Sequence, residues 1–146
     1  MKRAIIAIGL GFLLTACSEQ GECLQTSSNI MRIGFYNISD RKPRTIALDS
    51  VTLEGTDFLF YKGKSGTSVD LPLNPEWEEV TYNFYFGGLE EKIDVKYEVR
   101  AFAQEPACPV LVIYTLADIT GQSISEVYYT QRQITSTLTE NVKIYF

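Results

Sequence analysis

Three cysteines and the complete lack of histidine limit the chemistry open to this sequence of 146 residues. A thiol can carry a lipid, pair in a disulfide, ligate a metal or act as a nucleophile, and the three thiols belong to Cys17, Cys23 and Cys108. Without an imidazole there is no Ser-His-Asp or Cys-His site and no metal site built on histidine. We therefore expect no metallohydrolase, no nucleophilic hydrolase and no cofactor.

Cys17 follows a segment that has the three parts of a secretory signal. Two basic residues come first, 11 uncharged apolar residues follow from Ala4 to Leu14, and the small residue Ala16 precedes the cysteine. The apolar run is too short for a helix that crosses a bilayer, which needs about 20 residues. Leu14-Thr15-Ala16-Cys17 resembles the bacterial lipobox, which implies cleavage before Cys17 and acyl chains on that residue. An ordinary secretory signal with a chance cysteine is the alternative.

The lipobox divides the chain into a cleaved signal at 1–16, a lipidated tether at 17–22 and a folded domain at 23–146. Removing the signal takes away two of the 13 basic residues and none of the 18 acidic ones, so the mature chain carries a formal charge of −7. A net negative chain without a basic cluster argues against nucleic acid as a partner. The partner that the lipid itself implies is a membrane.

The residues after the lipobox indicate to which membrane of the cell envelope the protein is sent. Ser18 is not the aspartate that marks retention in the inner membrane of well-studied enteric bacteria, so this resemblance favours the outer membrane. Glu19 and Glu22 form a short version of the acidic stretch that sends some lipoproteins of Bacteroidota to the cell surface. We expect a lipid-anchored protein of the bacterial cell envelope, on either the periplasmic face or the cell surface.

With lipid on Cys17, Cys23 and Cys108 remain as a natural pair. Outside the cytoplasm nothing keeps thiols reduced, so a disulfide between them is the expected state. The bond would close a loop of about 85 residues, for which chain entropy gives at most about 4 to 5 kcal/mol. Two buried free cysteines are the alternative.

The elements that position these residues have the pattern of β-strands. Clusters of Gly, Pro, Asn and Asp break the chain into apolar or alternating runs of about 5 to 10 residues, which is typical of an all-β domain. Outside the central part of the chain these runs are 31–36, 46–53, 58–61, 68–71, 110–114, 124–134 and 142–146. We predict a turn at 62–66, a connection at 72–79, and at 110–114 a central strand covered on both faces.

The clearest pattern is a β-hairpin at 80–102. From Ile93 to Arg100 apolar residues alternate with charged ones, which predicts a strand with one face in the core and the other in water. Val80 to Phe86 also alternates, and Gly87-Gly88 between the two runs suits a tight reversal because glycine adopts positive φ freely. Eight or nine such strands predict a single antiparallel β-sandwich, Greek-key or immunoglobulin-like.

An outer-membrane β-barrel is an alternative that the C-terminal Phe146 raises by resemblance. Such a barrel needs at least eight strands of about 9 to 11 residues. Only the run from Ile93 to Phe102 is that long, and its polar face is charged. The sandwich is therefore the favoured fold.

Aromatic residues supply the candidate binding groups, with nine tyrosines, eight phenylalanines and one tryptophan in the chain. Trp77 lies in an acidic loop at 75–79, where an exposed indole could stack on a sugar ring or anchor a protein partner. Tyr82 and Tyr85 follow on the next strand and are further candidates. A tryptophan that plugs one end of the core is the alternative.

Carboxylates are the remaining source of catalysis, since a glycosidase needs two of them facing each other across a cleft. The densest supply is Glu76, Glu78, Glu79, Glu90, Glu91 and Asp94. Adjacent residues on a strand point to opposite faces, so ordinary solvated surface charge is the favoured interpretation. We expect that the protein is not an enzyme.

Several motifs together resemble a family of small uncharacterised lipoproteins of Bacteroidota. They are the lipobox-like 14–17, Cys23, the run 71–75, Cys108 and the ending 141–146. The resemblance implies no known activity. Our first hypothesis is a non-catalytic, lipid-tethered module that binds a protein or a glycan at the envelope. The alternatives are a purely structural envelope component and a carboxylate-based glycan hydrolase.

Overall fold

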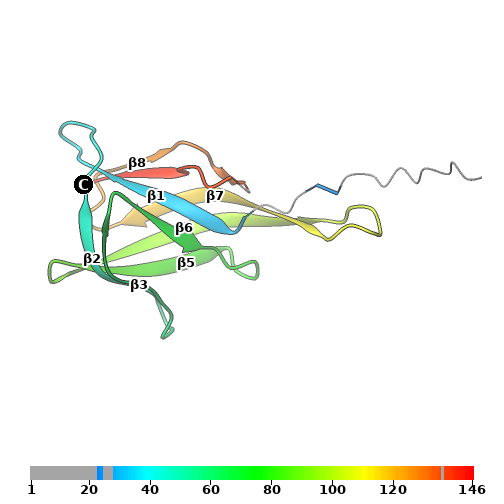
Figure 1. Cartoon of the computed structure of the whole chain (residues 1–146), viewed down its shortest axis with the longest axis horizontal. Coiled ribbons are helices and arrows are strands. Elements are labelled where there is room, and N and C mark those ends of the chain that lie inside the picture. The colour runs from blue at the N-terminus through cyan, green and yellow to red at the C-terminus, as the bar shows by residue number, and fades with distance from the viewer. Residues whose placement is uncertain (1–22, 25–27, 136) are drawn as a thin grey trace, which may run out of the picture.

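A computed structural model describes residues 23–24, 28–135 and 137–146, and β-strands are the regular elements of these ranges (Figure 1). The ten strands are β1 (Ile30–Tyr36), β2 (Ile46–Leu53), β3 (Leu59–Gly66), β4 (Ser68–Pro72), β5 (Glu79–Phe86), β6 (Leu89–Phe102), β7 (Leu111–Gly121), β8 (Glu126–Tyr129), β9 (Gln133–Ile134) and β10 (Val142–Tyr145). The all-β prediction is confirmed, whereas the predicted count of eight or nine strands is too low. The predicted signal and tether, with Cys17, lie outside the described residues.

The described strands form two sheets. One has four strands in the order β4-β1-β10-β8, and the other has six in the order β3-β2-β5-β6-β7-β9. Neighbouring strands pair antiparallel except β1 and β10, which run parallel with Ile33 opposite Val142 and Tyr36 opposite Tyr145. The prediction of a purely antiparallel fold is therefore wrong. A parallel pair needs a long crossover connection, and here the intervening part of the chain supplies it.

The predicted hairpin at 80–102 is the pair β5 and β6. Val80 lies opposite Val95 and Phe86 opposite Leu89, so the register follows from the reversal at Gly87 and Gly88. Both glycines have positive φ, 57° and 76°. The alternating apolar residues of both strands are buried, among them Tyr82, Phe84, Ile93, Val95 and Tyr97.

Three other segments differ from the prediction. The turn expected at 62–66 lies within β3, which continues as a strand to Gly66 with Gly63 at a φ of 60°. The strand expected at 110–114 is not covered on both faces, because Val110 is exposed and the next residues are half-buried. The run 124–134 contains two strands, β8 and β9, that belong to different sheets.

The two sheets supply residues to one buried apolar cluster. Phe35 of β1 meets Phe84 of β5 edge to face, with ring centroids 6.3 Å apart. The buried Tyr82 hydroxyl of β5 donates to the carbonyl of Pro72 in β4 at 2.5 Å. Side chains of one sheet thus pack against the other and hydrogen-bond to its backbone.

The hairpin of β6 and β7 extends past the other strands at one end of the molecule (Figure 1). β5 pairs with β6 only as far as Lys96, whereas β6 continues beside β7 until Phe102 lies opposite Leu111. In the part of the chain that the structure describes, no helix has the length and the apolar character needed to cross a bilayer.

Candidate functional site

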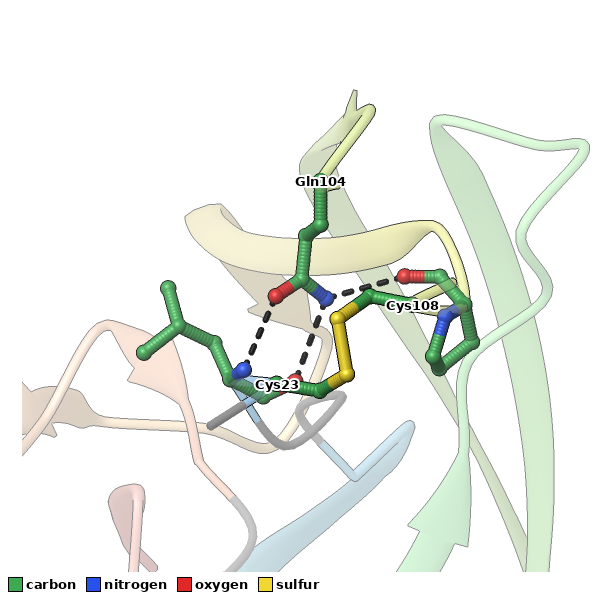
Figure 2. The surroundings of a disulfide bond; sticks show 5 residues. Cys23, Gln104 and Cys108 are labelled. Carbon is green, nitrogen blue, oxygen red and sulfur yellow. Dashed lines mark hydrogen bonds between the residues drawn. A yellow bond between two sulfur atoms is a disulfide. The ribbon is translucent and has the colours of Figure 1, made fainter. Parts of the chain in front are cut away.

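A disulfide between Cys23 and Cys108 fastens the start of the described chain to the loop that joins β6 and β7 (Figure 2). The two Cα atoms are 5.5 Å apart although the residues are 85 positions apart in sequence. That Cα distance falls within the usual range for disulfides. The pair expected from the cysteine count is thus found at disulfide distance.

Gln104 strengthens the same attachment (Figure 2). Its Oε1 accepts a hydrogen bond from the backbone N–H of Leu24 at 2.8 Å, and its Nε2 donates to the Leu24 carbonyl at 3.1 Å. Nε2 also donates to the carbonyl of Pro109 at 2.9 Å. One amide therefore holds the segment next to Cys23 and both sides of the β6–β7 loop in a fixed arrangement.

An apolar hollow of about 490 Å³ lies beside this attachment. Its lining residues are Leu24, Phe102, Ala103, Gln104, Glu105, Cys108, Leu111 and Ile113. Leu24 is 65% exposed, Phe102 46% and Val110 54%. We call Leu24 together with residues 102–111 the hairpin end. No motif in the sequence marks this surface, although the low charge of 102–111 is a signal that could have done so.

Trp77, the first candidate binding residue, is 42% exposed. The Asn74 side chain accepts a hydrogen bond from the Glu76 N–H at 2.8 Å, which shapes the loop before β5 and leaves the indole at the surface. A second hollow of about 310 Å³ lies near this loop and is lined by Leu53, Phe58, Phe60, Pro72, Leu73, Asn74 and Pro75. Trp77 is not among its lining residues.

The two candidate tyrosines do not join Trp77 in one site. Tyr82 is fully buried, so it offers no surface to a partner, and its expected binding role is corrected to a core role. Tyr85 is half-buried near the far end of β5, where its hydroxyl donates to Glu90 at 3.2 Å. Tyr82 faces the core with Val80 and Phe84, because every second residue of a strand lies on the same face.

Several acidic residues considered for catalysis have local partners. Glu91 is buried and accepts a hydrogen bond from the Ser123 N–H at 2.8 Å. Asp94 accepts from the Thr81 hydroxyl at 2.5 Å. Within 23–24, 28–135 and 137–146, no group of three or more His, Cys, Asp or Glu is placed to hold a metal ion.

The pKa values of several tyrosines in both sheets are raised above their ordinary value. Burial, followed by a hydrogen bond from its hydroxyl to Glu140, raises the pKa of Tyr36 to about 12. Burial is also the largest cause of the raised pKa values of Tyr82, Tyr97, Tyr114 and Tyr129. Packed structural tyrosines produce such shifts, because burial disfavours the charged phenolate.

One family model matches most of the chain, over residues 45–146, and it is described as a family of unknown function, DUF6452. The chain belongs to DUF6452. No curated protein and no solved structure matches it. The DUF6452 match covers β2 to β10, including Trp77 and Cys108, whereas Cys23 and β1 precede it. The disulfide therefore joins the segment before the DUF6452 match to a loop within the match.

Proposed function

We propose that this DUF6452 protein is a lipoprotein of the bacterial cell envelope, anchored by acyl chains on Cys17. In this proposal its β-domain is a non-catalytic module that binds a protein or a glycan. The observation that carries the proposal is the bond between Cys23 and Cys108, because it leaves Cys17 as the one remaining cysteine, at the end of the lipobox-like 14–17. Two or three acyl chains hold firmly, since each buried methylene contributes about 0.8 kcal/mol.

The disulfide also supports the proposed location outside the cytoplasm. Such bonds persist in oxidising surroundings outside the cytoplasm, which is where a signal at 1–16 would deliver the chain. The outer membrane is the proposed destination because Ser18 stands where a retention aspartate would stand. The acidic Glu19 and Glu22 fit the lipoproteins of Bacteroidota and leave both sides of that membrane open.

We further infer that the two sheets form a β-sandwich. Sheets that pack face to face place alternate side chains of each strand in a shared core. The edge-to-face contact of Phe35 with Phe84 and the hydrogen bond from Tyr82 to Pro72 support this arrangement. A sandwich presents its loops at two ends, and exposed loops are common positions for binding residues.

A lipid-labelling experiment tests the anchor. The full chain, expressed in a bacterium that processes lipoproteins, should incorporate a labelled fatty acid, and Cys17→Ala should abolish the label. Cys23→Ser is the matched control, because it removes a thiol that we place in the disulfide and should keep the label. Labelling that persists in Cys17→Ala would rule out this site.

A partner experiment tests the binding role. Trp77 is an exposed indole beside carboxylates, which is a common composition for an anchor residue at an interface. Envelope proteins and glycans retained by the lipidated protein should be reduced by Trp77→Ala. Tyr128→Ala removes an aromatic side chain of similar exposure on β8 and is expected to keep them. Equal retention by all three proteins would remove the support for binding through this loop.

A further inference from the structure

We propose that the hairpin end is a membrane-contact surface, which places its apolar side chains among the headgroups and upper acyl chains of a lipid bilayer. This inference rests on the proposed anchor at Cys17. It adds a second contact with the same membrane, made by the folded domain itself. The surface consists of described residues on two segments that the disulfide joins.

The hairpin end exposes apolar side chains from both of the segments that the disulfide joins. Phe102 lies opposite Leu111, so the two side chains share one face, and Leu24 lines the same hollow. Val110 lies immediately before β7, is 54% exposed and does not line the hollow. A hairpin that projects into water gains nothing from exposed apolar side chains. Apolar groups gathered at one end of the molecule fit insertion into the boundary layer of a bilayer.

The charge distribution favours the same end of the molecule. Between residues 102 and 111 the only charged side chain is Glu105. Charged side chains return two positions before Phe102, where Arg100 Nη2 lies 3.0 Å from Glu98 Oε2 in an exposed pair. At its opposite end β6 begins at Leu89 and continues with the charged run 90–92, of which Glu91 is buried. Because the mature chain is acidic, an end that carries a single charge meets the least repulsion from anionic lipids.

The position of the anchor holds this end close to the bilayer. Cys17 precedes Cys23 by six positions, and six fully extended residues span at most about 20 Å. Cys23 is bonded to Cys108, and Gln104 binds the backbone of Leu24. Acyl chains on Cys17 would therefore keep the hairpin end within about 20 Å of the lipid surface. A bilayer held this close is the occupant to which we assign the surface.

A fluorescence experiment tests the contact, because Trp77 is the only tryptophan of the chain. In a Trp77→Phe background, Phe102→Trp places an indole at the hairpin end. Phe58→Trp in the same background is the matched control, since Phe58 is an exposed phenylalanine before β3. The full chain is expressed in bacteria, purified from membranes and placed in vesicles of phosphatidylethanolamine and phosphatidylglycerol, with or without bromine on the acyl chains.

We expect the indole at 102 to shift its emission to shorter wavelength in vesicles and to lose emission when the acyl chains carry bromine. The indole at 58 should show neither change and should be quenched by iodide in the water. If Cys17 is acylated and bromine does not quench the indole at 102, or quenches both positions alike, the contact is refuted and the anchor stands. The membrane contact is also refuted if the indole at 102 is protected from iodide only after envelope protein is added. That result would indicate a protein partner.

The mass of the purified protein tests the anchor on Cys17 separately from the membrane contact of the hairpin end. A free thiol on Cys17 refutes the anchor. That thiol is then coupled to a maleimide-bearing phosphatidylethanolamine in the vesicles, which restores the attachment point artificially. The same comparison of positions 102 and 58 then decides the membrane contact independently of how the cell attaches the protein.

Discussion

Single side chains connect the two sheets, and Tyr82 is the clearest example. Its buried hydroxyl donates to the Pro72 carbonyl, so Tyr82→Phe leaves that carbonyl without its donor. We expect the free energy of unfolding to fall by about 1 to 3 kcal/mol, measured by urea denaturation. Tyr85→Phe removes a partly exposed hydrogen bond from the same strand and should cost less than about 0.5 kcal/mol. Equal losses would contradict the role assigned to Tyr82.

The disulfide between Cys23 and Cys108 should contribute measurably to the stability of the fold. Replacing both Cys23 and Cys108 by serine releases a loop of 85 positions in the unfolded chain. We expect a loss of about 2 to 4 kcal/mol in the free energy of unfolding, seen as a lower urea midpoint. Reducing the parent protein with dithiothreitol should give the same loss. In the Cys17→Ala protein, denatured without reduction, any thiol that reacts with a maleimide would contradict the bond.

Among the elements, the β5–β6 hairpin permits a test of its turn. Gly88 has a φ of 76°, and a Cβ added there would meet nothing within 4 Å, so a substitution reports backbone strain alone. Gly88→Ala should lower the free energy of unfolding by about 1 to 2 kcal/mol, because an L-residue resists this conformation. Gly88→Asn should lose less, since asparagine tolerates positive φ, and the urea midpoints compare the two. Equal midpoints for the glycine and alanine forms would show that the turn is unstrained.

This hairpin was predictable because all of its information is local. The strands alternate with a period of two, the glycines mark the reversal, and the register follows from the turn. The turn expected at 62–66 was wrong because its two glycines lie inside β3, where pairing with β2 overrides local preference. The parallel pairing of β1 with β10 joins distant parts of the chain, and no local pattern specifies such a partner.

The candidate site was predictable from the sequence only in part, because it depends on how the strands assemble. The pairing of Cys23 with Cys108 follows from counting thiols once Cys17 is set apart. The hairpin end was missed because 110–114 has the composition of a central strand, and apolar composition alone does not distinguish a buried strand from one that projects beyond its sheet. Its exposure depends on where β5 begins to pair with β6, at Glu79 opposite Lys96, which only the assembled sheets determine.

The buried tyrosines predict how the whole molecule responds to alkali. Burial raises the pKa of Tyr36 from 10.0 to about 12, and it raises the pKa values of Tyr82, Tyr97, Tyr114 and Tyr129. Above pH 10 the unfolded chain therefore releases tyrosine protons that the folded chain still holds. Because the unfolded state then binds fewer protons, the free energy of unfolding falls as pH rises. Each unit of pKa difference corresponds to about 1.4 kcal/mol once the pH exceeds both values.

Urea midpoints measured from neutral pH to pH 12 test this dependence, and the expected curve is flat at first and descends above pH 10. The folded-state phenols should also ionise late, which the absorbance of tyrosinate reports directly. Tyr36→Phe removes one of the shifted groups, so its curve should descend less steeply than that of the parent protein between pH 10 and about pH 12. Identical slopes for the two proteins would show that Tyr36 ionises as easily in the folded chain as in the unfolded one, and that the burial of its ring does not contribute to alkaline unfolding.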